Sequence, residues 1–194
     1  TFQQGHLSAR VNETVYDYSW KELIHSINSI GDSFVNILDS IPVTVMFIDN
    51  HFNVVYMNKN GLALLKTDLN RLIGKKCYDQ FKTGDCQTKN CALKQAMEKN
   101  KVITRETDAH PLGQEVLIEY TGAPLKDGKG NILGATEIVL DRTEQKRAAE
   151  KIKKIGDYQR KEFEKISFVF RSMADNDLTK NYEASKTDKE LLEV

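Results

Sequence analysis

The chain has 194 residues, which is enough for one domain of ordinary size with extensions or for two small domains. Basic and acidic residues number 28 each, so the formal net charge is zero and no overall field favours nucleic acid or an anionic membrane as a partner. The three cysteines are an odd number in a chain this long, so a disulfide-stapled secreted domain is disfavoured and a reducing, cytoplasmic location is expected.

The first element in chain order is a helix predicted over residues 18–41. Its apolar positions are separated alternately by three and four residues, which is the a/d spacing of a coiled coil. A helix packed on its own domain would also be apolar on one face, but the unbroken alternation favours pairing with another helix, in a parallel homodimer. This a/d stripe consists of Trp20, Leu23, Ile27, Ile30, Phe34, Ile37 and Ile41.

Pro42 ends this helix, and short β-rich segments follow. A hairpin is predicted with its turn at Asn50-His51, and Asn58 is placed to cap a short helix. More short helices come next, the best of them over residues 91–100. The order predicts an α+β domain of about 100 residues, with one five-stranded antiparallel sheet and short helices on one face. The predicted strands are residues 43–49, 53–58, 102–108, 114–125 and 132–141.

A long charged helix is predicted from residue 142 to a stop at Asp175-Asn176. Its apolar residues form two seams, and eight residues separate Ile155 from Phe163 where a strict heptad repeat has seven. A stutter in a coiled coil produces such a slip of phase, so two helix registers of similar energy are expected there. The seams are Ala148, Ile152 and Ile155, followed by Phe163, Ile166, Phe170 and Met173.

The central segment resembles a PAS domain. The resemblance rests on "IPVTVMFIDNHFNVVYMNKNGLALL", "GKKCYDQF" and "GNILGATEIVLDRTEQK", which together span about residues 39–145. The third stretch is similar to the closing strand of the family and its Asp-x-Thr exit, here Asp141 and Thr143. The resemblance implies that residues 40–143 form the PAS domain, and that Asp141 and Thr143 pass its state to the helix that follows.

The flanks resemble HAMP modules. Residues 1–39 look like a connector, with "GHLSARV" near its start, and a second helix; residues 144–194 look like a linker helix and a partial second module, with "MADNDLTKNYE" as its connector. This order is similar to that of methyl-accepting chemotaxis transducers and, less specifically, of sensor histidine kinases. It implies a sensory and signal-relay segment whose missing output couples to a histidine kinase. The alternative is a structural PAS module that dimerises and holds no ligand.

We read the sequence as a piece of a longer protein, which leaves open that it is the cytosolic part of a membrane-anchored receptor. No apolar run of 18 residues is present, so no membrane contact is expected within this segment. The sequence also holds no Ser/His/Asp constellation, glycine-rich phosphate loop or HExxH motif, so we expect no enzymatic activity. Asp79, Asp85 and Glu98 are interpreted as solvated charges on helices.

The resemblance to PAS domains implies a pocket between the sheet and the helices, which holds haem, flavin, a small metabolite or nothing. Haem is disfavoured because none of the four histidines lies in residues 58–100, where an axial ligand would be expected. A light-sensing flavin site is disfavoured because "NCALKQ" keeps the reactive-cysteine motif at Asn90, Cys91 and Gln95 but has Ala92 in place of the phosphate-binding arginine. A small molecule, a metal or no cofactor therefore remain open.

For a small organic ligand, we expect lining residues that alternate inward on the strands or face the sheet from the helix. The same residues would form ordinary core in an empty domain. They are Val45, Phe47, Tyr56, Leu93, Met97, Ile118, Tyr120 and Ile138.

All three cysteines lie in one stretch, "GKKCYDQFKTGDCQTKNCALKQAM", as Cys77, Cys86 and Cys91. Three interpretations stay open. They pack as small apolar side chains; Cys86 and Cys91 form a disulfide that responds to redox state; or three thiolates begin a zinc or iron–sulfur site, for which Asp85 or His110 would be the fourth ligand.

Overall fold

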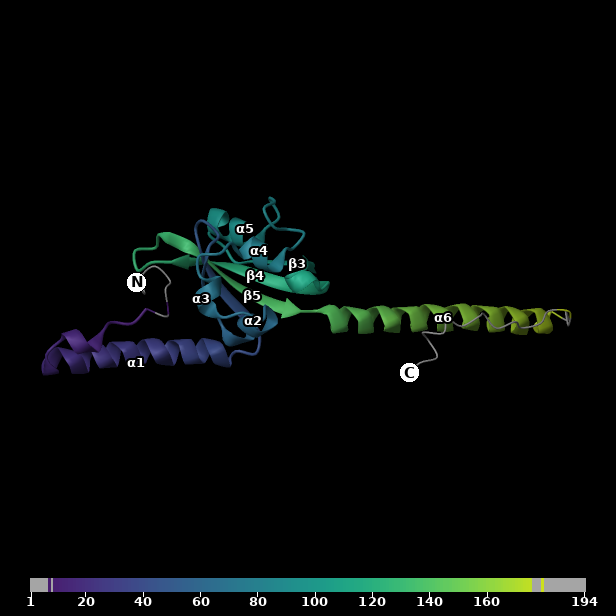
Figure 1. The fold of residues 1–194 in the computed structure, drawn as a ribbon. Coiled ribbons are helices and arrows are strands. Elements are labelled where there is room, and N and C mark those ends of the chain that lie inside the picture. The colour runs from purple at the N-terminus through teal and green to yellow at the C-terminus, as the bar shows by residue number, and fades with distance from the viewer. Residues whose placement is uncertain (1–6, 8, 176–178, 180–194) are drawn as a thin grey trace. The chain divides into compact units, whose positions relative to one another are not determined.

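The computed structural model describes residues 7, 9–175 and 179, in two compact units that meet between Arg142 and Thr143. In the first unit, an antiparallel sheet of order β2-β1-β5-β4-β3 carries short helices on one face (Figure 1). The α+β class and the five predicted strands are confirmed. The strands are β1 (Thr44–Asp49), β2 (Val54–Met57), β3 (Ile103–Ala109), β4 (Val116–Lys126) and β5 (Ile132–Asp141). The short helices are α2 (Lys59–Leu64), α3 (Leu69–Leu72), α4 (Cys77–Phe81) and α5 (Ala92–Lys99), with single 3-10 turns at Glu13–Val15 and Pro111–Gly113.

Helix α1 (Tyr18–Ser40) has the predicted extent. It begins at Asp17, whose side chain accepts a hydrogen bond from the backbone N–H of Trp20 at 3.3 Å, and it stops ahead of Pro42. One side of the helix packs on its own unit through Ile24 and Asn28, which are buried, and through the half-buried Val35 and Leu38.

The a/d stripe of α1 lies beside this packed side and is not covered by it. Its side chains are 44 to 70% exposed between Trp20 and Ile37. An apolar face that is not needed for packing within the unit is available to another helix. Pairing with a second chain remains a prediction.

Strands β1 and β2 are buried on both faces. Met46 and Ile48 face the short helices, whereas Val45 and Phe47 face α1. The ladder between the two strands is irregular, because Phe47 pairs with Tyr56 but Ile48 pairs with Val54. Val55 is therefore an extra residue on β2, a β-bulge, and it changes the side of the sheet to which β2 directs its side chains.

Asn58 joins α1, β1 and α2 through one fully buried amide. Its Oδ1 accepts hydrogen bonds from the N–H groups of Val45 and Gly61 at 3.0 and 3.1 Å, so its predicted role as a helix cap is confirmed. Its Nδ2 donates to the carbonyls that end α1 and lead into β1, those of Leu38, Ile41 and Val43. The amide therefore fixes how α1 enters the sheet.

The second unit contains α6 (Thr143–Ala174), which continues unbroken through the predicted slip of phase. Ile152, Phe163 and Phe170 are exposed along it. The helix ends one residue ahead of the predicted stop. The HAMP-like connector and helix predicted beyond residue 175 lie outside the described residues, apart from Thr179, as do residues 1–6 and 8 of the first flank.

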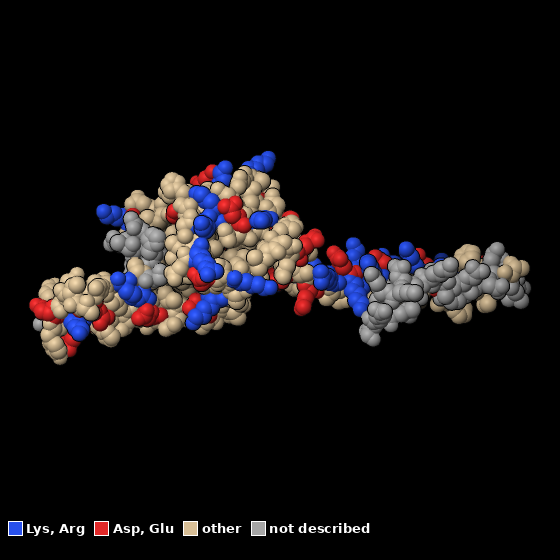
Figure 2. Space-filling view, in the orientation of Figure 1, with Lys and Arg blue, Asp and Glu red and all other residues tan. Residues whose placement is uncertain are grey.

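The surface carries both signs of charge. Figure 2 shows basic and acidic side chains interspersed over the face in view, so this face has no large field of one sign. Within the described part of the chain, none of the helices combines the length and the hydrophobicity that crossing a membrane requires.

Candidate functional site

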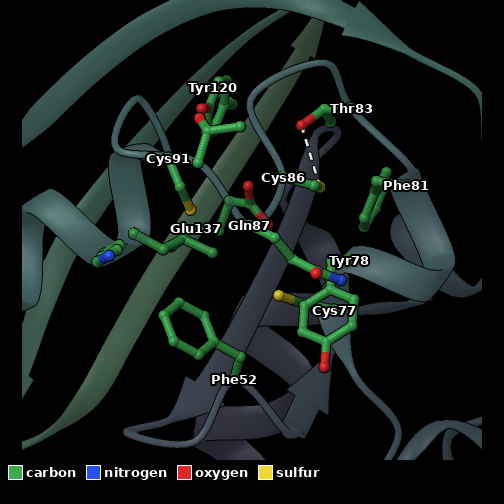
Figure 3. Close-up of a pocket in the computed structure, with 13 residues that line it drawn as sticks. Phe52, Cys77, Tyr78, Phe81, Thr83, Cys86, Gln87, Cys91, Tyr120 and Glu137 are labelled. Atoms are coloured by element: carbon green, nitrogen blue, oxygen red, sulfur yellow. Dashed lines mark hydrogen bonds between the residues drawn. The ribbon is translucent and has the colours of Figure 1, made fainter.

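A cavity of about 170 Å³ lies between the sheet and the segment that connects α4 to α5. All three cysteines open onto it, and the rings of Phe52, Tyr78 and Phe81 form much of its apolar wall (Figure 3). The remaining lining residues are mostly polar: Thr83, Gln87, Thr88, Leu93, Lys94, Tyr120 and Glu137.

The cysteine-bearing segment is anchored to the sheet by Asp85. Its carboxylate accepts hydrogen bonds from Tyr120 Oη at 2.8 Å and Arg105 Nε at 3.0 Å. The Tyr120 hydroxyl also accepts a hydrogen bond from the N–H of Ala92, the first residue of α5, at 3.2 Å. The interpretation of Asp85 as a solvated charge is therefore wrong: β3 and β4 bury it to 8% exposure and supply its partners. Asp79 and Glu98 are exposed, as expected.

The three cysteines have free thiols, and burial acts on all of them in the same direction. Burial raises the pKa of Cys77, and the nearby Glu137 adds to the rise. Burial also raises the pKa of Cys86, despite its contact with Thr83 Oγ1 at 3.1 Å, and the pKa of Cys91, despite the N–H groups at the start of α5. The protonated thiol therefore dominates at pH 7; it is a weak nucleophile and must lose its proton before it binds a metal.

Glu137 is the acidic group of the cavity. It lies on β5, is 6% exposed, and lies between Cys91 and the other two cysteines in the view of Figure 3. Burial alone raises the pKa of Glu137 to about 7. Every fully enclosed side-chain oxygen or nitrogen in the described residues has a hydrogen-bond partner. Since no partner of the Glu137 carboxylate is found among these residues, its oxygens are not fully enclosed and open into the cavity.

The described residues form no ready-made metal site around the cysteines. Among the described residues, no three His, Cys, Asp or Glu side chains are arranged to hold an ion. Asp85 is engaged by the sheet, and His110 lies with Nδ1 3.3 Å from the Lys82 carbonyl, outside the cavity lining. The redox, metal and packing interpretations of Cys77, Cys86 and Cys91 all remain predictions.

The structure divides the predicted lining residues among several places. Leu93 and Tyr120 line the cavity, Met97 packs against the neighbouring core, and Ile118 lines a second hollow of about 300 Å³ that also includes Asp141. We correct the placement of the other four: they lie on the opposite face of the sheet. Three of them, Val45, Phe47 and Tyr56, pack under α1, and Ile138 is 41% exposed.

Helix α1 buries the second face of β1 and β2, so both faces of these strands are apolar. The alternation of apolar residues therefore does not show which face lines the cavity. The Phe47 and Tyr56 rings, 5.4 Å apart, belong to that second face, where Tyr56 Oη donates to Asp39 at 3.0 Å. On β5, Ile138 was expected to face inward, but it is exposed and its neighbour Glu137 is buried, so Glu137 was missed.

The predicted signal exit lies at the end of the strand that bears Glu137. Asp141 ends β5 opposite Ile118, and the N–H of Arg142 donates to the Leu117 carbonyl at 2.8 Å. Thr143 is the first residue of α6. Glu137 precedes Asp141 by four positions in the sequence.

This fold and cavity define the class of the protein. A family profile described as PAS fold matches residues 38–147. The chain therefore belongs to the PAS family, whose members are sensory domains of signalling proteins.

Solved structures with the same fold support this assignment. The PAS domain of a protein from Colwellia psychrerythraea is 20% identical, with a TM-score of 0.52 over 59% of this chain and 98% of that one. An RNA-binding light-oxygen-voltage receptor is 15% identical, with a TM-score of 0.56 over 67% of this chain and 38% of that one. At these identities the likeness establishes the fold alone.

A relative of known role is similar over the same part of the chain. The transcriptional activator RocR of Bacillus subtilis (strain 168) is 30% identical over 117 residues, which are 59% of this chain and 24% of RocR. The chain therefore spans about a quarter of the length of this curated relative.

Proposed function

We propose that this chain is the sensory and signal-relay segment of a chemotaxis transducer, in which the state of the PAS cavity reaches the output through dimeric helices. The observation that carries the proposal is the position of Glu137. It opens into the cavity on the same strand that ends at the exit residue Asp141. A change in the charge or partner of Glu137 thus acts on the strand that leads into α6.

The first flank supports a HAMP-like module. Its connector runs back along α1, because Arg10 contacts Asp32 at 2.7 Å, Val11 contacts Asn28 at 3.0 Å, and Glu13 contacts His25 at 3.3 Å. A connector antiparallel to the helix it precedes is the arrangement that a HAMP module requires. The second module, predicted in residues 144–194, is part of the same proposal.

The exposed a/d stripe supports a parallel homodimer. In this proposal the segment is cytoplasmic, catalyses no reaction itself, binds neither nucleic acid nor membrane, and controls a histidine kinase through output domains. A sensor histidine kinase is a second candidate for the whole protein. A structural PAS module without a ligand is the third. Glu137, which has no partner among the residues that the structure describes, argues against it, because a cavity with no ligand gains nothing from a desolvated acid.

The dimer is tested by a pair of variants on α1. Ile30→Asp places a charge in the a/d stripe, whereas Ser29→Asp places the same charge one residue away, outside the stripe. Light scattering should give a dimer mass for the unaltered chain and for Ser29→Asp, and a monomer mass for Ile30→Asp. A monomer for the unaltered chain, or a dimer for Ile30→Asp, would contradict the proposed assembly.

The relay is tested by cysteine crosslinking at positions 163, 166 and 170 of α6, with and without Glu137→Gln. Two helix registers should give different crosslinking patterns when the charge in the cavity is removed. The chain without added cysteines serves as the control for crosslinks through the native thiols. Identical patterns in both backgrounds would refute the relay and leave only dimerisation.

A further inference from the structure

The carboxylate of Glu137, for which the described residues supply no partner, indicates what kind of ligand the cavity takes. A buried carboxylate without a partner is destabilising, and folded proteins keep such groups where something else supplies the partner. Glu137 is more than nine-tenths buried, opens into the cavity, and has no hydrogen-bond donor or cation as a partner within the described residues.

The groups around Glu137 do not supply a charge that could balance it. The titratable side chains that line the cavity are Cys77 and Tyr78 from α4, Cys86 and Cys91 from the connecting segment, Lys94 from α5 and Tyr120 from β4. The thiols and Tyr120 are neutral at pH 7, because burial raises the pKa of each of these four groups. The side chain of Lys94 is about half exposed, and its ammonium lies 3.9 Å from the carboxylate of Glu98 on the same helix.

The size and wall of the cavity favour a small molecule with an apolar part. Its volume is about 170 Å³. A cavity of about 150 Å³ in another protein holds a benzene molecule, so a single ring or a short aliphatic group fits. The aromatic rings of Phe52, Tyr78 and Phe81 line the cavity; such rings pack against apolar groups, and their faces attract cations.

We propose that the cavity binds a small organic cation, an alkyl or aryl ammonium, whose charged nitrogen donates hydrogen bonds to Glu137 and whose apolar part lies against Phe52, Tyr78 and Phe81. The proposal rests on the sensory role of the cavity proposed above, and it names the ligand class. A metal ion is the competing occupant, but the described acidic and thiol side chains do not converge on a common point.

The experiment measures binding to the full 194-residue chain at pH 8, where Glu137 is mostly ionised, by ligand-observed NMR and calorimetry. The probes are two pairs of similar shape: benzylammonium with benzyl alcohol, and methylammonium with methanol. Zn²⁺ is titrated separately. The variants are Glu137→Gln, which removes the charge at nearly constant shape, and Glu115→Gln, which makes the same change at an exposed position. A thermal melt confirms that each variant is folded.

We expect the ammonium of each pair to bind more tightly than its alcohol, and Glu137→Gln to weaken ammonium binding by roughly 10-fold to 100-fold, as for a hydrogen bond to a charged group. Alcohol binding should be nearly unchanged, and Glu115→Gln should behave as the unaltered chain. Binding should weaken below pH 7 as Glu137 becomes protonated.

Equal affinity for ammonium and alcohol, or no effect of Glu137→Gln, would overturn the proposal. So would the absence of binding by every probe. Stoichiometric Zn²⁺ binding that is lost in Glu137→Gln and in Cys86→Ser would also overturn it, and would assign the site to a metal. Selective ammonium binding together with unchanged crosslinks on α6 would instead support the ligand class and refute the relay.

Discussion

The two faces of the sheet differ in how completely their polar groups are paired. Under α1, Asn58 makes five hydrogen bonds with backbone groups and Tyr56 is bonded to Asp39. On the cavity face, Glu137 opens into the cavity beside three protonated thiols. The face under α1 is therefore built to hold one geometry, whereas the cavity face keeps a polar group whose free energy changes with what enters.

The largest effect should come from Asn58→Ala on the paired face. The change removes the amide that joins α1, β1 and α2, and leaves buried backbone groups without partners. We expect a loss of about 4 kcal/mol in the free energy of unfolding, measured by urea denaturation. Asn90→Ala, at an exposed turn between α4 and α5, should change it by less than about 0.5 kcal/mol. Similar losses in both variants would show that the paired face is not specially constrained.

The second-largest effect is a gain in the free energy of unfolding in Glu137→Gln, and its size depends on pH. Because burial raises the pKa of Glu137 from 4.5 to about 7, the folded state favours the protonated form. The stability that this contributes is fully present below pH 4.5 and is lost as the pH rises through 7. Glutamine does not titrate, so Glu137→Gln should gain about 3 kcal/mol relative to the unaltered chain between pH 4 and pH 8.

The comparison of unfolding free energies at these two pH values tests this expectation. The same measurement on Glu115→Gln, at an exposed position, is the control for a general effect of removing a charge. Parallel stability curves for Glu137→Gln and the unaltered chain would mean that Glu137 has a partner in solution, and the contrast between the two faces would fail.

The smallest effect concerns the anchor of the cysteine segment. Tyr120→Phe removes the hydroxyl that bonds to Asp85 and Ala92, but Asp85 keeps Arg105. We expect a loss of about 1–2 kcal/mol in stability. Hydrogen exchange should rise in residues 83–92 and remain unchanged under α1. Tyr78→Phe, in the same cavity wall, is the matched control and should cost less than about 0.5 kcal/mol. An equal rise in exchange on both faces would contradict independent anchoring.

Local sequence signals determined most of the fold. Asp17 and Asn58 start helices because a short polar side chain can satisfy free N–H groups in the first turn, and Pro42 stops α1 because it restricts the residue before it. The five strands follow from short β-rich runs between turn residues, and the a/d stripe follows from the helical period. These signals need only neighbours within a few residues, so the sequence alone contains them.

Tertiary structure alone decided which residues form the site. Val45, Phe47 and Tyr56 were expected in the cavity, but α1 covers the other face of β1 and β2 and takes these side chains. Asp85 looks like a surface charge until Arg105 and Tyr120, 20 and 35 residues away, are brought to it. In the sequence, Glu137 looks like an ordinary polar residue of a strand, and only the packing of the cysteine segment on the sheet places it in the cavity. Burial and pairing are set by distant segments, which no local pattern encodes, and so the sequence determined the elements while their packing decided the chemistry of the cavity.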